Sequence, residues 1–115
     1  MVIVAATAYF FGERSPKNLR APTVRGAARV GGPLSANPGL WNSPNSSLSF
    51  DYQWQRCDGS CTDIDGATRR SYLPVPGDLG SRIRVSVFAS DASFGPRDLG
   101  TALIHSHETQ PVTGR

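Results

Sequence analysis

The chain of 115 residues contains few of the side chains on which most enzymes depend. Glutamate and histidine each occur only twice, at Glu13 and Glu108 and at His105 and His107. No Gly-x-Ser-x-Gly motif presents a nucleophilic serine, and no glycine-rich loop precedes a helix to cradle a phosphate. The chain has enough aspartates to supply the two catalytic carboxylates of a glycosidase, but no sequence pattern supports such a pair. The sequence therefore predicts no catalytic residues, no cofactor and no enzymatic activity.

Long hydrophobic runs and helical periodicity are also missing. No segment approaches the roughly 18 consecutive apolar residues that a membrane-spanning helix needs. Residues 1–11 are mostly apolar, but no charge precedes Glu13, whereas a secretory signal starts with a basic region. We therefore expect no membrane insertion, and any export signal would lie upstream in a longer parent protein.

Positive charge is present but scattered. The formal net charge is +3, and only Arg69 and Arg70 are adjacent basic residues. A nucleic-acid-binding surface needs basic residues clustered on one face. We therefore predict no nucleic-acid partner and interpret the arginines as surface residues whose stems pack on their neighbours.

Short strand patterns separated by turns make up most of the chain, which has 12 Gly and 9 Pro. Residues 48–57 alternate apolar and polar side chains, and residues 82–90 repeat the pattern, although Phe88 interrupts the polar row. Such alternation indicates strands with one buried face and one solvent-exposed face. About seven short strands at roughly 8–12-residue spacing predict an all-β fold, an antiparallel β-sandwich.

The residues of these strands that face inward define the predicted core. Trp54 lies in the middle of an alternating strand and is expected to anchor the core by packing between the two sheets. Asp78 and Gly80, with Tyr72 nearby, are expected to hold the chain crossing before the strand at residues 82–90. The predicted core residues are Leu34, Phe50, Tyr52, Trp54, Ile64, Tyr72, Leu79, Ile83, Val85 and Val87.

The two cysteines carry the strongest local signal. Cys57 and Cys61 flank a three-residue loop that contains Gly59, and such a hairpin brings two strand ends within disulfide range. Their C-x3-C spacing differs from the C-x2-C of redox and zinc motifs. We therefore predict a structural disulfide in an oxidising compartment.

Two weak metal-binding patterns are better explained as surface features. His105 and His107 share one face of a possible last strand, with Glu108 as a third donor, but exposed terminal histidines are usually surface residues. Residues 63–66, Asp-Ile-Asp-Gly, match only a fragment of a calcium loop. We predict no metal site.

An internal repeat suggests a modular protein. Residues 2–14 align with residues 85–97 without a gap. Residues 15–22 form a polar, proline-bounded connector. We predict that residues 1–21 are the remnant of a preceding repeat plus a linker, residues 22–110 a complete domain and residues 111–115 the start of a following repeat or a tail. The orphan strand at residues 2–11 is expected to add to a sheet edge, pair with another molecule or stay disordered.

Two motifs carry a family resemblance that extends over residues 22–112. The runs Tyr-Gln-Trp-Gln-Arg-Cys at residues 52–57 and Asp-x-Gly-x-x-Ile-Arg-Val at residues 78–85 together resemble the immunoglobulin-like repeats of large exported proteins of actinobacteria and their relatives. The resemblance implies an immunoglobulin-like sandwich of about seven strands, an extracellular or cell-surface location, tandem repeats as neighbours and no catalysis. Such repeats serve as spacers or adhesive segments.

Two other roles remain open at this point. One is an accessory module that binds cell-wall glycan or another surface polysaccharide or protein beside a secreted hydrolase. Trp41, which follows a Pro-Gly turn, and residues 9–11 would then stack on the ligand; a fully buried Trp41 would favour the spacer. The other role is a decoration domain on a phage virion.

Overall fold

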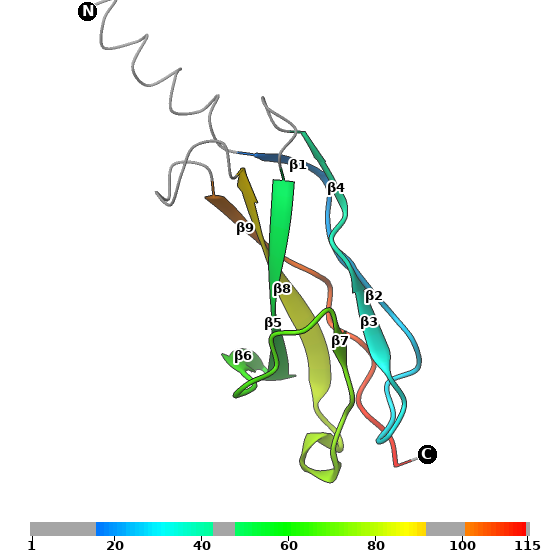
Figure 1. Cartoon of the computed structure of the whole chain (residues 1–115). Coiled ribbons are helices and arrows are strands. Elements are labelled where there is room, and N and C mark those ends of the chain that lie inside the picture. The colour runs from blue at the N-terminus through cyan, green and yellow to red at the C-terminus, as the bar shows by residue number, and fades with distance from the viewer. Residues whose placement is uncertain (1–15, 43–47, 92–100, 115) are drawn as a thin grey trace, which may run out of the picture.

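A computed structural model describes residues 16–42, 48–91 and 101–114, and in it the chain is all-β with antiparallel sheets (Figure 1). A four-stranded sheet has the order β6 (Ser60–Asp63), β5 (Leu48–Asp58), β8 (Arg82–Asp91) and β9 (Thr101–His105). A three-stranded sheet has the order β2 (Thr23–Arg25), β3 (Leu34–Asn37) and β7 (Ser71–Tyr72). At one end, β1 (Lys17–Arg20) pairs with β4 (Leu40–Asn42).

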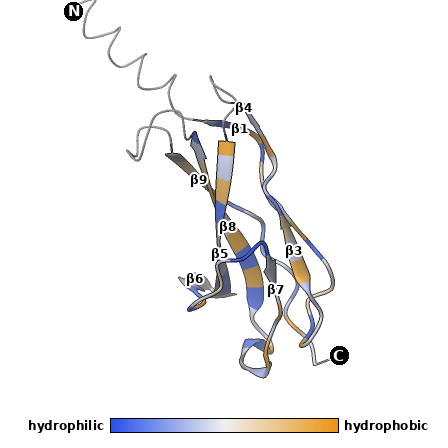
Figure 2. Ribbon diagram, viewed as in Figure 1, coloured by the Kyte–Doolittle hydropathy of each residue, from blue (hydrophilic) through white to orange (hydrophobic). Residues whose placement is uncertain are grey.

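The two sheets enclose one hydrophobic core, as in a β-sandwich. Alternate residues of β5 and β8 face inward, and Trp54 lies opposite Val85 in the antiparallel register. Both side chains are fully buried, together with Leu34 of the facing sheet. Figure 2 shows the resulting hydrophobic segments along β3 and β8. The predicted alternation of inward-facing and outward-facing residues along β5 and β8 is confirmed.

Most of the predicted core is buried, but Leu79 is not. The buried core cluster contains Leu34, Trp54, Ile64, Ile83, Val85 and Val87, and Phe50, Tyr52 and Tyr72 pack against it half-buried. Leu79 is 52% exposed because a 3-10 turn, η1 (Pro76–Asp78), directs the preceding Asp78 inward instead. The prediction of a buried Leu79 is therefore wrong. The sequence analysis also missed two core residues, Ala36 and Val112.

At both ends, ordered contacts extend beyond the predicted domain of residues 22–110. Residues 17–20, expected to belong to a connector, form β1 and pair with β4. At the other end, Val112 is 2% exposed in the core, so the folded unit extends past residue 110. Residues 2–14 and residues 92–97 of their repeat partner lie outside the described residues.

The described residues contain nine strands rather than about seven. Two short interruptions account for the larger number of strands. Pro22 separates β1 from β2, and the turn at Pro38 and Gly39 separates β3 from the short β4. In this part of the chain, no helix is long and apolar enough to cross a membrane.

Candidate functional site

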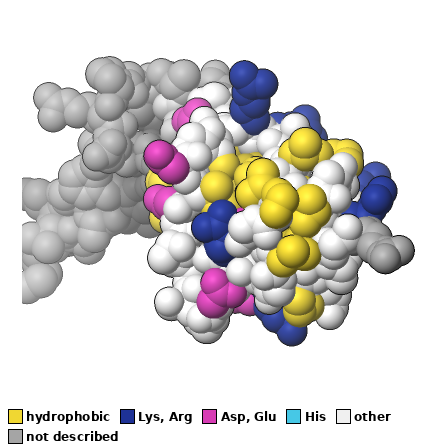
Figure 3. All heavy atoms as spheres, turned by 90° about the horizontal axis from the view of Figure 1, so that it is seen from below, with side chains coloured by type: hydrophobic (Ala, Val, Ile, Leu, Met, Phe, Trp, Pro, Cys, Tyr) yellow, Lys and Arg dark blue, Asp and Glu magenta, His cyan; other side chains and the backbone are white. Residues whose placement is uncertain are grey.

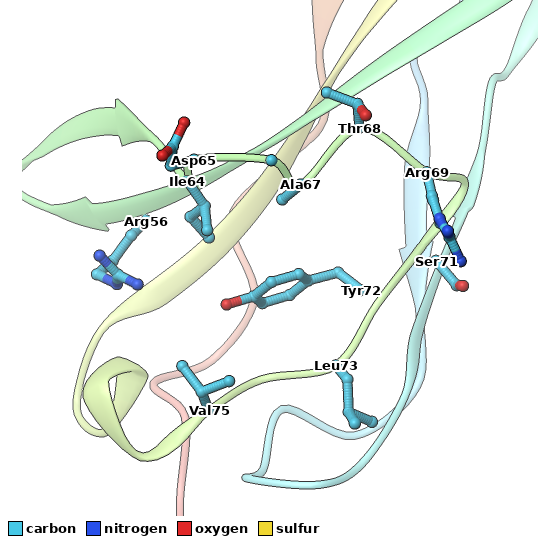
Figure 4. A pocket seen from close by; sticks show the side chains of 11 residues that line it. Arg56, Ile64, Asp65, Ala67, Thr68, Arg69, Ser71, Tyr72, Leu73 and Val75 are labelled. Carbon is cyan, nitrogen blue, oxygen red and sulfur yellow. The ribbon is translucent and has the colours of Figure 1, made fainter.

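A groove opens between the two sheets on the side where β6 and β7 diverge (Figure 4). Its volume is about 320 Å³. One wall is the turn after β6, which is anchored because Ile64 N–H donates to Trp54 O at 2.9 Å and Trp54 N–H donates to Ala67 O at 2.9 Å. The other wall is β7 and the chain after it. The lining residues are Arg56, Ile64, Asp65, Gly66, Ala67, Thr68, Arg69, Ser71, Tyr72, Leu73 and Val75.

The base of the groove is fixed by the aromatic core. The Tyr72 ring stacks on Trp54 with 5.8 Å between ring centroids and 26° between planes. The indole N–H of Trp54 donates to Arg69 O at 2.7 Å. Trp54 therefore acts as the predicted core residue and also holds the backbone of the groove wall in place.

A buried carboxylate joins the groove to the adjacent turn. Asp78 is 0% exposed, and its Oδ1 accepts a hydrogen bond from Arg56 Nε at 2.6 Å. Its Oδ2 accepts from the Tyr72 hydroxyl at 2.5 Å and from Val75 N–H at 2.9 Å. Three donors thus compensate the cost of burying this charge. The predicted association of Asp78 with Tyr72 is confirmed.

The pKa values in this network follow from its contacts. Burial alone raises the pKa of Asp78, but hydrogen bonds from Tyr72, Val75 N–H and Arg56 together lower it below its ordinary value. Burial and the hydrogen bond to Asp78 raise the pKa of Tyr72 to about 12. The hydrogen bond to Asp78 also raises the pKa of Arg56. The network is therefore an ion pair with a neutral tyrosine at neutral pH.

The sequence analysis missed Arg56, although a signal for it was present. Arg56 continues the inward phase of Phe50, Tyr52 and Trp54 along β5. A charged residue at an inward position indicates a buried partner of opposite charge. No comparable sequence pattern indicated Arg69. It reaches the groove only because the irregular segment that carries it runs along the groove.

The groove presents an apolar floor with polar groups at its rim. Figure 4 shows Arg56 and Arg69 on opposite sides of Tyr72, whose hydroxyl points toward Arg56. Within the described ranges, neither the Thr68 nor the Ser71 hydroxyl has a histidine or carboxylate partner, so no nucleophile–base pair forms here. This arrangement can receive an apolar group from a ligand or partner.

The two cysteines form a disulfide at the end of the β5–β6 hairpin. Glu108 approaches from the C-terminal segment, with its Oε2 atom 3.7 Å from Cys61 Sγ. These three residues are the one cluster of potential metal ligands in the part of the chain that the structure describes. Because both sulfurs are bonded to each other, they are not available as thiolate ligands.

The histidines and the aspartate turn do not assemble a metal site in the described residues. His105 Nδ1 lies 2.7 Å from Ser86 Oγ in a hydrogen bond across β8 and β9. Burial and the nearby Arg84 lower the pKa of His105. Asp63 accepts a hydrogen bond from Gln55 Nε2 at 2.8 Å.

Trp41 lies at the opposite end of the sandwich from the groove and is half-buried. Its ring packs against Phe50 with 6.1 Å between centroids, and its indole N–H donates to Pro38 O at 2.6 Å. The side chain is neither fully buried nor free to use its N–H for a ligand. Residues 9–11, the other predicted stacking group, lie outside the described residues.

Comparisons with known proteins add no relative. No protein-family model, no curated protein and no solved structure matches the chain.

Proposed function

We propose that this chain is an immunoglobulin-like, non-enzymatic module that serves as a spacer in an extracellular or cell-surface protein built from neighbouring repeats. The all-β sandwich and the Cys57–Cys61 disulfide support this proposal, since disulfides persist in oxidising compartments. A spacer must transmit tension between its two ends without unfolding. The observation that matters most is therefore how the C-terminal segment is held to the rest of the sandwich.

Residues 28–30, which follow β2, run parallel to the C-terminal segment at residues 112–113. Arg29 and Thr113 form a parallel bridge, in which Val30 N–H donates to Thr113 O at 2.8 Å and Thr113 N–H donates to Ala28 O at 3.0 Å. β1 lies at one end of the sandwich and the C-terminus at the other (Figure 1). A pull on both ends slides these segments past each other, so both hydrogen bonds resist together rather than break one after another.

The same C-terminal segment is also fixed to the four-stranded sheet. Val112 N–H donates to Ser81 O at 2.8 Å, and Gly80 N–H donates to Val112 O at 2.9 Å. Burial of the Val112 side chain adds apolar contacts to this connection. The last segment thus joins both sheets at the end of the molecule where force would enter.

Single-molecule pulling on the two ends of the full chain tests the proposal. We expect one cooperative force peak, and Thr113→Pro should lower it because proline has no N–H to donate to Ala28. Thr113→Ala is the matched control, because it keeps the backbone N–H and should retain most of the peak force. Smooth extension of the unaltered chain without a peak would contradict the spacer role.

The glycan-binding alternative gains no specific support. Its main stacking candidate, Trp41, is half-buried with its N–H bonded internally. The spacer therefore remains the function that the described contacts support best.

A further inference from the structure

Three exposed aliphatic side chains gather at the end of the sandwich that carries η1 and the C-terminus. Leu73, Val75 and Leu79, which we call the end patch, are 55%, 45% and 52% exposed. Figure 3 views this end from below, and hydrophobic side chains gather there with both basic and acidic side chains around them. Single exposed hydrophobic residues are ordinary, but a contiguous group marks an interaction surface.

The end patch continues into the groove. Leu73 and Val75 line both surfaces, and Figure 4 shows them below Tyr72 on the chain that leads to η1. The apolar surface therefore extends from the tip of the sandwich to the floor of the groove. The Asp78 hydrogen bond to Val75 N–H holds this segment in place, so the surface is pre-formed.

The path of the chain identifies what covers this surface. Hydrogen bonds fix residues 112 and 113, and a Cβ atom built on Gly114 would lie 3.8 Å from Leu79 Cδ2. Chain that continues beyond Gly114 leaves from beside the end patch. In two chains joined in series, Arg115 and residues 1–16 of the second copy connect this end to its β1, so the second copy is tethered beside the end patch.

The opposite end of the molecule offers a matching apolar surface. Leu19 in β1 is 62% exposed and Leu40 in β4 is 52% exposed. If a second copy follows the first, its β1–β4 end meets the end patch of the copy before it. Aliphatic side chains on both surfaces would lose contact with water when the two ends meet, which favours an apolar contact.

We infer that the end patch is the docking surface for the β1–β4 end of a following copy of this module. This inference rests on the proposed tandem arrangement and adds that neighbouring modules are coupled rather than freely jointed.

The experiment compares the full chain with a protein in which two full chains are joined in series. We expect the urea midpoint of the two-copy protein to lie above that of the single chain by about 0.5 M. Leu79→Asp in the first copy should abolish the difference. The same substitution in the second copy, whose end patch has no module after it, should have no effect.

Two further controls separate docking from folding. Leu79→Asp in the single chain should leave the midpoint nearly unchanged, because Leu79 is exposed. Leu103→Asp, at a 45% exposed position on the outer face of the four-stranded sheet, should leave the coupling intact. Equal midpoints for one and two copies, or equal effects of Leu79→Asp in both copies, would overturn the inference. A force peak in the single chain would still stand in that case, so the spacer proposal fails or survives independently.

Discussion

The two ends of this sandwich are stabilised in different ways. Around η1, a buried carboxylate accepts three hydrogen bonds, and a disulfide closes the nearby β5–β6 hairpin. Around β1 and β4, the main anchor is the half-buried Trp41, which packs on Phe50 and donates one hydrogen bond to Pro38. One end depends on specific polar and covalent contacts, and the other on a short strand pair and one aromatic side chain.

This difference indicates at which end of the fold substitutions should reduce stability most. Loss of the Asp78 charge leaves three donors without their charged, buried acceptor, so the η1 end should respond sharply to single substitutions. Aromatic packing at a half-exposed site degrades gradually, so the β1–β4 end should respond weakly. The following substitutions test this difference in order of expected effect.

Asp78→Asn should cause the largest loss, about 3 kcal/mol in the free energy of unfolding, because it removes the charge of a buried acceptor that three donors share. Urea unfolding at neutral pH measures this loss. Asp65→Asn, at an exposed position on the groove, is the control and should change stability by less than about 0.5 kcal/mol. Equal effects of the two substitutions would remove the distinction between the two ends.

The same carboxylate sets an acid limit. Because the pKa of Asp78 is lowered from 3.8, its contribution is fully present above that pH and is lost as the pH falls through the folded-state pKa. Asp78→Asn should therefore flatten this part of the acid dependence of unfolding.

Removing the disulfide should cost about 2 kcal/mol, since closing a loop of about five residues restricts the unfolded chain only modestly. Replacing both Cys57 and Cys61 with alanine and measuring urea unfolding tests this estimate. Reduction of the unaltered chain by a dithiol should give a similar loss. A protein that no longer folds would show that the hairpin depends on the bond more than the loop length implies.

Tyr72→Phe should cost about 1.5 kcal/mol, because it removes one hydrogen bond to a charged acceptor and keeps the ring on Trp54. The pH profile gives a second signature. With its pKa raised from 10.0 to about 12, Tyr72 contributes stability that is present below pH 10.0 and lost as the pH rises through about 12. The variant should lack this alkaline loss, and an unchanged alkaline profile would argue against the Tyr72–Asp78 contact.

Trp41→Phe should have the smallest effect, about 1 kcal/mol, from loss of the hydrogen bond to Pro38. Hydrogen exchange should show faster opening of amides in β1 and β4 than in β5 and β8. The matched substitution Trp54→Phe should cost more, because Trp54 is fully buried and its N–H holds the groove wall. A larger effect at Trp41 than at Trp54 would reverse the comparison of the two ends.

Sequence reasoning succeeded where one local pattern controls the outcome. Alternation placed β5 and β8 and most of their inward residues, and the short glycine-containing loop indicated the disulfide. It failed at Leu79, because whether Leu79 or Asp78 faces inward depends on the 3-10 turn and on the partners that Asp78 finds. It also failed at Val112, whose burial depends on where the last segment crosses both sheets.

The sequence by itself determined the all-β character, the phases of the long strands and the cysteine pair, because each depends on neighbouring residues and the period of the backbone. Only the tertiary structure decided which distant groups meet. It brought Arg56, Tyr72 and Asp78 together, laid the last segment parallel to residues 28–30, and gathered Leu73, Val75 and Leu79 at one end. Such contacts depend on strand register and on how sheets pack, and no local pattern encodes either of them.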